Sequence, residues 1–538
     1  MQLKDHYQTR LRKARTAEAR LRTISQRHGL AAGLVRRIQI AAVQAVAFYG
    51  AELWWQGQKN RQDDLQRLIN RQARAITGVF RTTPGGPLMI EAGLDPAEVA
   101  LDNRQRSYAA RLLTLPEDHP AAQVLPVSFR QGDRQAQPGE QSPANREWAE
   151  SGRLRSLGQH LARSLANIIR TDPSGGFERT KETYPSTFPG NIIVPGHDEA
   201  IEQARQTLPG LTLWSDGSRL EDGRVGAGVA WKVSPGDWRT AEIPLGRSKE
   251  VFDAELEGAC RALELARTIG ESRQVTVLLD SQAAIKRLEH TEPGPGQVFA
   301  LRAHRAARRL RERRVEVTVQ WVPGHMGVEG NERADQAAKR AAARPARDDE
   351  VSLAHVHRAI TEARRDHRQK WIDSALARRS LRAQRAYRPT RGLRPDPTAA
   401  AAPKNIASRY YQLKTGHAAT GSYLRKIKAR EDSTCRWCRA PDETVHHALF
   451  ECRQWSTERR KLRGDLTRSK IQYPSTSEDH PEGRLFGNWK ATKAILTLIA
   501  STEIGMRHGE WLQAAERARK DNEYGIERLD EEERVGEG

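Results

Sequence analysis

The sequence contains little cysteine, few aromatic residues and fewer acids than bases. Three of its four cysteines fall in one short segment, 435–452, so they cannot form a disulfide framework for a chain of 538 residues. They indicate instead a metal site in a reducing compartment. Aromatic residues make up 6% and hydrophobic residues 37% of the chain, enough for several modest cores separated by solvated linkers. At about 150 residues per domain, the length predicts roughly three to four folded units.

A long apolar run is also absent. The most apolar window, 38–55, is interrupted by Gln39, Gln44 and Glu52, so it predicts a buried helix and not a membrane span. The basic N-terminus lacks the apolar segment and the small-residue cleavage site of a secretory signal. We therefore expect an intracellular protein, in the nucleus or the cytoplasm, that is not secreted and has no membrane partner.

The net charge favours an anionic partner, nucleic acid first. Lys and Arg number 89 against 68 Asp and Glu, which gives a formal charge of +21. A helix expected at 298–315 carries seven arginines and one acid, which suits the phosphates of a bound duplex, although a solvated helix face has the same pattern. Residues 404–470 carry 16 basic and 7 acidic residues, a net charge of +9. Nothing in the sequence specifies an oligomeric state.

Six stretches of the chain differ in their patterning. Residues 1–115 have apolar residues at helical spacing and predict a helical region. Residues 209–345 alternate short β-rich runs with amphipathic helices in the order β β β α β α β α, which predicts a compact mixed α/β domain. The other stretches are a Gln-, Pro-, Gly- and Ser-rich linker, partly disordered, at 116–208; a helix and a Pro/Ala linker at 346–403; a cysteine module at 404–475; and a helical and acidic tail at 476–538.

Four acids of the α/β stretch lie where a metal ion could be bound. Asp216 and Asp280 each end an apolar strand, and ligand sites of open α/β sheets lie at the carboxyl ends of strands. Glu255 lies in the first turns of the intervening helix, and Asp335 lies one turn inside the last helix. Each acid alone could be a turn, cap or solvated residue. Together they would repel one another unless cations lay between them, and hard divalent cations such as Mg²⁺ prefer such oxygen ligands.

Four segments of this stretch form a distinctive set: WSDGSRLEDGRVGAGVAW, FDAELEGACRAL, LLDSQAAI and WVPGHMGVEGNERADQAAKRA. In these segments the chain resembles type 1 ribonuclease H domains, specifically those attached to reverse transcriptases of non-LTR retrotransposons. The resemblance implies a central mixed β-sheet flanked by helices, and Mg²⁺-dependent endonucleolytic hydrolysis of the RNA strand of RNA/DNA hybrids. It also implies that Asp216, Glu255, Asp280 and Asp335 bind two Mg²⁺ or Mn²⁺ ions, and that His325 is a mobile loop histidine that moves a proton. The alternative for His325 is a loop histidine hydrogen-bonded to the backbone.

The cysteine module has the spacing of a tetrahedral zinc site. Two cysteines two residues apart are followed by a histidine and a third cysteine: Cys435, Cys438, His447 and Cys452. His446 is a rival ligand, and similarity to the CCHC zinc knuckles that follow retrotransposon ribonuclease H domains, with their His-x4-Cys spacing, favours His447. We expect one structural Zn²⁺. With its basic charge and Trp437, the module could hold single-stranded RNA or DNA, and the alternative is a zinc that only stabilises the fold.

The N-terminal region resembles the thumb-like end of a retrotransposon reverse transcriptase through the segment ITGVFRTTPGGPLMIEAGLDP. No strand-borne YxDD-type motif precedes it, and Asp63 and Asp64 fall in a helical pattern, so polymerase activity is not expected. We expect a multidomain α/β chain that is the C-terminal part of a longer element-encoded protein. Two other functions stay open. One is a nucleic-acid-binding fragment whose nuclease is idle, and the other is a DNA strand transferase of the same broad fold, against which Asp335 and the Pro-Gly-His loop speak.

Overall fold

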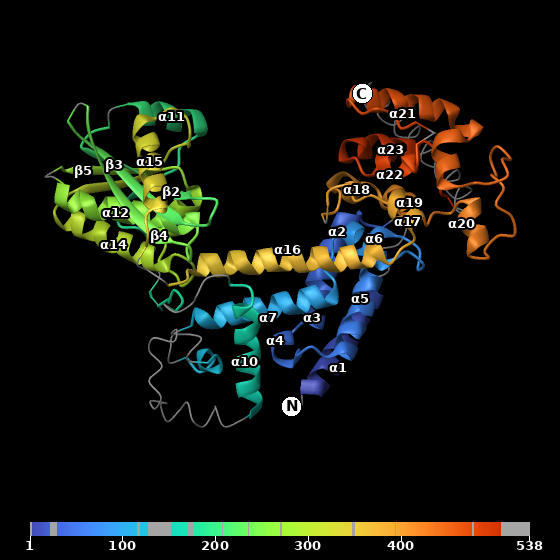
Figure 1. The fold of residues 1–538 in the computed structure, drawn as a ribbon, viewed down its shortest axis with the longest axis horizontal. Helices are drawn as coiled ribbons and strands as arrows, with labels where there is room; N and C mark the ends of the chain where they lie inside the picture. Colours follow the sequence, from blue (N-terminus) through green and yellow to red (C-terminus); the bar gives the residue numbers. More distant parts are fainter. Residues whose placement is uncertain are drawn as a thin grey trace, which may run out of the picture. The chain divides into compact units, whose positions relative to one another are not determined.

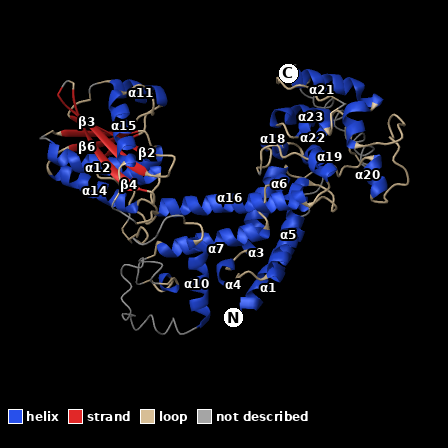
Figure 2. Ribbon diagram, in the orientation of Figure 1, coloured by secondary structure: helices blue, strands red, loops and turns tan. Residues whose placement is uncertain are grey.

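The computed structural model describes residues 3–21, 29–115, 119–126, 152–169, 176–346, 350–475 and 478–506, apart from positions 182, 185, 207, 235, 270, 271 and 393. The chain forms two compact units. Unit 1 consists of residues 1–101 together with 365–538, and unit 2 consists of residues 102–364. Figure 2 shows that the strands gather in one part of the chain, which belongs to unit 2.

Unit 2 contains a six-stranded mixed sheet in the order β1-β6-β5-β2-β3-β4. β2, β3 and β4 form an antiparallel meander, whereas β1, β6, β5 and β2 pair in parallel. The mixed sheet predicted from the sequence is thereby confirmed. The strands are β1 (Asn191–Ile193), β2 (Leu211–Arg219), β3 (Val225–Ser234), β4 (Asp237–Gly246), β5 (Gln274–Leu279) and β6 (Glu316–Trp321).

Helices cover both faces of this sheet, because successive side chains of a strand point to opposite sides (Figure 1). On β2, the side chain of Ser215 lies beside Gly258 of α12, whereas that of Trp214 lies beside Gly330 of α15. Helices α13 and α14 share an apolar core with α12 and with inward-facing residues of β2, β5 and β6. The helices are α12 (Val251–Ile269), α13 (Gln282–Leu288), α14 (Gln297–Glu312) and α15 (Glu329–Ala343).

Helix α15 lies directly against β3, because a glycine there leaves room for the helix backbone. A Cβ atom at Gly228 would lie 2.2 Å from the carbonyl oxygen of Ala334, closer than any real contact. Gly228 is the register partner of Asp216 on β2. The close approach therefore brings α15, which carries Asp335, toward the carboxyl end of β2.

The stretch 116–208, expected to be a linker, contributes helices and one strand in the parts that the structure describes. Helix α10 (Gly152–Ala166) and α11 (His197–Arg205) form here, and β1 pairs with β6 in parallel at the edge of the sheet. The apolar run that forms β1 is only three residues long and is flanked by Pro and Gly, so its pattern is too short to stand out. Most of the Pro- and Gln-rich part of this stretch, 127–151, lies outside the described residues.

A small helical core lies beside the sheet within unit 2. It joins the end of α7 (Ala97–Leu113) and η3 (Ala122–Val124) to α10 and to the start of α16 (Leu353–Ala377). Leu112, Leu161, Phe177 and Val356 are all buried in it. The first turns of α16, which follow the sheet domain in sequence, are therefore part of unit 2.

Unit 1 is helical and is built from both ends of the chain. Its N-terminal elements are α1 (Leu3–Leu21), α2 (Ala32–Ile38), η2 (Gln39–Gln44), α3 (Ala45–Ala47), α4 (Ala51–Trp54), α5 (Lys59–Thr77) and α6 (Gly85–Ala92). Its C-terminal elements are α17 (Leu381–Ala386), α18 (Pro397–Ala401), α19 (Lys404–Thr415), α20 (Gly421–Lys426), η6 (His447–Glu451), η7 (Arg453–Trp455), α21 (Ser456–Arg468), α22 (Pro481–Phe486), η8 (Trp489–Ala491) and α23 (Thr492–Ala500). The helical N-terminus predicted from the sequence is confirmed.

One hydrophobic core runs through both halves of unit 1. Leu65 and Ile69 of α5 belong to the same buried cluster as Tyr410 and Leu413 of α19. A buried ion pair adds to it, because Lys414 Nζ lies 2.7 Å from Glu91 Oε1 and the Tyr387 hydroxyl donates to the same carboxylate at 2.7 Å. The N-terminal region and the cysteine module, which the sequence pattern divides into separate segments, are thus parts of one folded unit.

The apolar window 38–55 is largely helical, and its first part belongs to one uninterrupted helical stretch that runs from Ala32 to Ala47. η2, α3 and α4 follow one another, with Val43 and Trp54 buried in the core. Among the helices that the structure describes, none has the length and apolar character needed to cross a membrane.

Candidate functional site

Three of the predicted carboxylates meet at one edge of the sheet. β2 and β5 pair in parallel with Ser215 opposite Leu279, so the next residues lie side by side: Asp216, still within β2, and Asp280, directly after β5. Glu255, in the second turn of α12, faces them. The carboxylate oxygens of these three residues lie within 4.8 Å of one another. The parallel register of two neighbouring strands is what brings residues so far apart in sequence together.

The backbone packs tightly around this cluster. The amide of Gly217 donates to Asp216 Oδ1 at 2.8 Å, and the Trp321 indole donates to the carbonyl oxygen of Asp280 at 2.9 Å. A Cβ atom at Gly324 would lie 2.4 Å from Asp280 Oδ2, so any larger residue there would displace that carboxylate. Glu255 Oε2 is buried and has no hydrogen-bond partner among the described residues. This buried oxygen without a hydrogen-bond partner lies close to the carboxylate oxygens of the other two acids. Such a group of oxygen ligands fits a hard divalent cation.

Burial and mutual repulsion hold protons on the cluster when no cation is present. Burial, followed by the charges of Asp280 and Asp335, raises the pKa of Asp216 to about 7. Burial and the neighbouring Asp216 and Asp280 raise the pKa of Glu255 well above its usual range. Burial also raises the pKa of Asp280, against the opposing charge of His325. A bound cation would reverse this preference, because it favours the ionised carboxylates and releases their protons.

Asp335 and His325 lie at the margin of the cluster. Asp335 is not among the three closest acids, but its charge helps to raise the pKa of Asp216, and its Oδ2 accepts a hydrogen bond from Lys339 Nζ at 2.6 Å. His325 is exposed, in the loop between β6 and α15, with a left-handed φ of 58° that is uncommon outside glycine. Lys339 was not singled out from the sequence, although its i+4 spacing from Asp335 on one helix could have indicated the pair.

The four predicted zinc ligands also come together. Their ligand atoms, from Cys435, Cys438, His447 and Cys452, lie within 4.8 Å of one another. Cys438 Sγ is 3.2 Å from His447 Nε2, and no cysteine of the chain forms a disulfide. Burial raises the pKa of the Cys438 thiol, but hydrogen bonds from the Ala440 amide and from neighbouring ligands lower it to about 6. Three sulfurs and one nitrogen at this spacing are consistent with a structural zinc knuckle.

The geometry separates the two candidate histidines. His447 turns Nδ1 toward Glu451 Oε2, at 3.5 Å, and so presents Nε2 to the sulfurs. His446 lies outside the cluster, with its ring nitrogens 3.3 Å from Glu451 and 3.6 Å from Glu482. A carboxylate that fixes the ring of a metal-binding histidine is a common second partner at metal sites. Glu451 was missed from the sequence, although it follows His447 by four residues.

The arginine-rich helix α14 is only partly available to a ligand. Arg302 Nη1 lies 2.5 Å from Glu257 Oε2, and Arg302 Nη2 lies 3.0 Å from Glu264 Oε2, both on α12. This arginine therefore holds α14 against α12. The other arginines of the 298–315 stretch are exposed.

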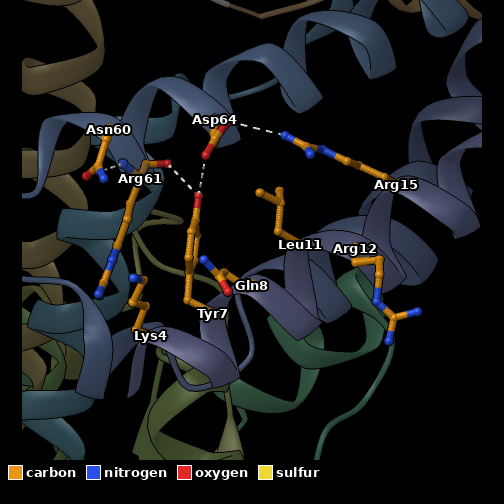
Figure 3. Close-up of a pocket in the computed structure, with 9 residues that line it drawn as sticks. All are labelled: Lys4, Tyr7, Gln8, Leu11, Arg12, Arg15, Asn60, Arg61 and Asp64. Carbon is orange, nitrogen blue, oxygen red and sulfur yellow. Dashed lines mark hydrogen bonds and ion pairs between the residues drawn. The ribbon is translucent and has the colours of Figure 1, made fainter. Parts of the chain in front are cut away.

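A basic pocket lies in unit 1 between α1 and α5 (Figure 3). Its volume is about 360 Å³, and the charged residues that line it are Lys4, Arg12, Arg15, Arg61 and Asp64. Asp64 is already engaged by the Tyr7 hydroxyl and by Arg15, each at 3.2 Å. In the part of the chain that the structure describes, the side chains of Lys4 and Arg12 have no ion-pair or hydrogen-bond partner. The pocket therefore presents positive charge that the chain itself does not neutralise.

Known proteins resemble parts of this chain. Residues 209–343 match the family model of RNase H. The chain is 26% identical over 237 residues to the Pol polyprotein of equine infectious anemia virus (strain Wyoming), covering 41% of this chain and 19% of that protein, and the same figures hold for isolate 1369 of that virus. The chain thus spans about a fifth of the length of the curated relatives that it matches.

Similar solved structures cover about a quarter of this chain. RNase H1 from the archaeon Halobacterium salinarum is 24% identical, with 24% of this chain and 96% of that chain covered and a TM-score of 0.20. LC11-RNase H1 in complex with an RNA/DNA hybrid is 21% identical, with 25% and 96% covered and a TM-score of 0.21. The match to the family model includes all four acids and His325. Residues 209–343 of this chain therefore form an RNase H domain.

Proposed function

We propose that this chain cleaves the RNA strand of RNA/DNA hybrids endonucleolytically. The reaction would use two divalent cations, Mg²⁺ or Mn²⁺, bound by Asp216, Glu255, Asp280 and Asp335. The observation that carries the proposal is the meeting of the Asp216, Glu255 and Asp280 carboxylates within 4.8 Å of one another, the first two buried and the third half-buried. Bound divalent cations would supply an activated water and stabilise the leaving oxygen of the phosphodiester. The acids themselves keep the cations at one end of the sheet, and Gly324 leaves room for the Asp280 carboxylate.

His325 is proposed to move the proton that the leaving 3′ oxygen requires. It is exposed and close enough to Asp280 to influence the pKa of that carboxyl. An imidazole titrates near neutral pH, so it can both accept and release a proton under working conditions.

The substrate is proposed to be recognised by its shape and by its 2′-hydroxyl groups, not by base sequence. On α14, Arg302 is held by two acids of α12 and is not available to a ligand. The other arginines of this helix are exposed, and their charge suits the phosphates of a bound hybrid. LC11-RNase H1, which is similar to about a quarter of this chain, was solved in complex with an RNA/DNA hybrid. The similarity to Pol polyproteins supports the further proposal that the chain is part of a retrotransposon reverse-transcription protein that acts inside the cell.

Cleavage of a labelled RNA/DNA hybrid by the full chain in Mg²⁺ tests this function. We expect cutting of the RNA strand only, with no cutting of single-stranded RNA, duplex RNA or duplex DNA. Asp280→Asn should abolish cleavage and leave hybrid binding largely intact, whereas Asp222→Asn, an exposed acid of the same domain, should cut normally. A folded chain that binds the hybrid without cutting it would refute the nuclease, and joining of DNA ends would indicate a strand transferase.

A second candidate function, nucleic-acid binding by unit 1 without any nuclease, is favoured by the basic pocket. The pocket contains four basic side chains and one acid, Asp64, which is already bonded to Tyr7 and Arg15. Its excess positive charge would attract phosphate groups. The Lys4→Ala/Arg12→Ala variant removes the two unpartnered cations, so it should weaken binding of a labelled single-stranded oligonucleotide and reduce the slope of log affinity against log salt by about 1–2. Lys370→Ala/Arg382→Ala removes the same charge from exposed sites elsewhere in unit 1 and is the matched control. Equal slopes for the two variants would exclude the pocket as a phosphate site.

The zinc cluster is proposed to hold one structural Zn²⁺ through Cys435, Cys438, His447 and Cys452. Elemental analysis of the purified chain should find one zinc ion per chain. A result of no zinc would refute this part of the proposal.

A further inference from the structure

A short segment beyond the RNase H domain is bound to the start of helix α12. This segment, residues 351–358, which we call the clamp segment, includes the first turns of α16 and lies outside the 209–343 match. The amide of Ser352 donates to the carbonyl oxygen of Ser248 at 2.9 Å. The Ser352 hydroxyl donates to Asp253 Oδ2 at 2.6 Å. Both bonds join the clamp segment to the residues that lead into α12.

Glu250 is the main junction of this contact. Its Oε1 lies 2.8 Å from His355 Nδ1, and its Oε2 accepts hydrogen bonds from Arg358 Nη1 and Arg219 Nη1, each at 2.6 Å. Two of these partners belong to the clamp segment, and Arg219 ends β2, three residues after Asp216. Charge-assisted hydrogen bonds of this length are among the strong ones in proteins. Glu250 therefore ties the clamp segment to the strand that carries Asp216.

Asp253 fixes the first turn of α12. It is fully buried, and its Oδ2 accepts hydrogen bonds from the Glu250 amide at 2.7 Å and from Ser352. Such a side chain, bonded to a free amide at the start of a helix, sets where the helix begins. Glu255 follows two residues later, and a Cβ atom at Gly217 would lie only 2.8 Å from its backbone nitrogen. The first turns of α12 and the end of β2 thus touch directly, so a shift of one moves Glu255 relative to Asp216.

We propose that the clamp segment is a positioning element for the carboxylate cluster. Ser352, His355 and Arg358 act through Asp253 and Glu250 to hold Glu255 and Asp216 at the separation that a divalent cation requires. The expected effect on catalysis rests on the proposed function, whereas the expected effect on Mg²⁺ binding does not. Outer partners of metal ligands typically account for about 10–100-fold in metal affinity or activity. The working RNase H unit of this chain accordingly extends past residue 343, to the first turns of α16.

The test compares variants of the full chain by calorimetric titration with Mg²⁺ alone, and by kcat and KM on the hybrid. Glu250→Gln and Arg358→Ala should each weaken Mg²⁺ binding about 10-fold, and lower kcat while leaving KM nearly unchanged. Arg358→Lys keeps a cation that can reach Glu250 and should restore most of both. Thr361→Ala, an exposed substitution on the same helix, is the matched control and should behave as wild type. Thermal unfolding of each variant shows that it is folded at the assay temperature.

Wild-type Mg²⁺ binding and kcat in folded Glu250→Gln and Arg358→Ala would overturn the proposal, because the clamp segment would then only stabilise the unit. If Glu250→Gln unfolds, Arg358→Ala decides alone, since the Arg358 side chain is 44% exposed and Glu250 keeps Arg219 and His355 as partners. A wild-type chain that binds Mg²⁺ but does not cut the hybrid would refute the proposed function only, and the Mg²⁺ titrations would still decide on the clamp segment. A wild-type chain that binds no Mg²⁺ would overturn both.

Discussion

Replacing Lys414 with methionine should destabilise unit 1 far more than a surface substitution. Its ammonium lies 2.7 Å from Glu91 Oε1, and the two side chains are 1% and 2% exposed. Methionine has a similar length but leaves the Glu91 carboxylate buried without its cation. Removing one partner of a buried pair costs about 3–5 kcal/mol, a large part of the roughly 5–15 kcal/mol by which a domain is stable.

The neighbours of the pair limit this loss and suggest a rescue. Glu91 keeps the hydrogen bond from the Tyr387 hydroxyl, so the carboxylate is not left without any partner. Lys414 also donates to the Thr390 hydroxyl, which loses that bond in the variant. Adding Glu91→Gln removes the orphaned charge, so the double variant should recover at least half of the lost free energy of unfolding.

Hydrogen exchange of peptides from α6 and α19 measures the opening free energy at this site, with α12 of unit 2 as an internal reference. Lys426→Met, which replaces an exposed lysine of α20, is the control. A loss of less than about 0.5 kcal/mol for Lys414→Met, the size of an ordinary surface effect, would refute the reasoning. So would a double variant no more stable than the single one.

Three further predictions concern the two proposed metal sites. The metal-free chain should lose stability as the pH rises from about 4 to about 7, because folding raises the pKa of Asp216 from 3.8 to about 7 and the folded state therefore binds that proton more tightly. Mg²⁺ competes with the proton, so the rise in Tm that it causes should be larger at pH 8 than at pH 6, and an equal rise would contradict this. Gly324→Ala should weaken Mg²⁺ binding in a folded chain, because its Cβ would meet Asp280 Oδ2 at 2.4 Å, and unchanged calorimetric affinity would contradict the contact. His447→Ala should release the zinc, whereas His446→Ala should keep it, as elemental analysis of the two variants will show.

The proximity of three of the predicted acids could be expected from the sequence, because each lies in a short local pattern. Asp216 and Asp280 each end a short apolar run, and parallel pairing of those runs is enough to bring the two side chains together. Glu255 follows from the amphipathic pattern of the helix between them. Asp335 was expected from its position in the last helix, and the resemblance to ribonuclease H domains added a role for His325. The structure places both at the margin of the cluster, and their roles stay predictions.

Contacts between distant segments were not predictable in the same way. The ion pair of Lys414 with Glu91, and the engagement of Arg302 by acids of α12, depend on how helices pack, which residue periodicity does not encode. The division of the chain at Pro- and Gly-rich stretches also suggested separate N- and C-terminal modules. In the structure these modules share a core, because neither half has a complete apolar interior by itself.

The interrupted course of unit 1 has a consequence for folding during synthesis. The ribosome releases residues 1–101 first, but the apolar partners of α5 in α19 are made only after the whole of unit 2. Until then, side chains such as Leu65 and Ile69 lack the surface that covers them, and exposed apolar faces of this kind favour aggregation or chaperone binding. Unit 2 can fold in the meantime, which shortens the loop that unit 1 must close and so lowers its entropic cost. Newly made chains should therefore acquire the RNase H domain before unit 1.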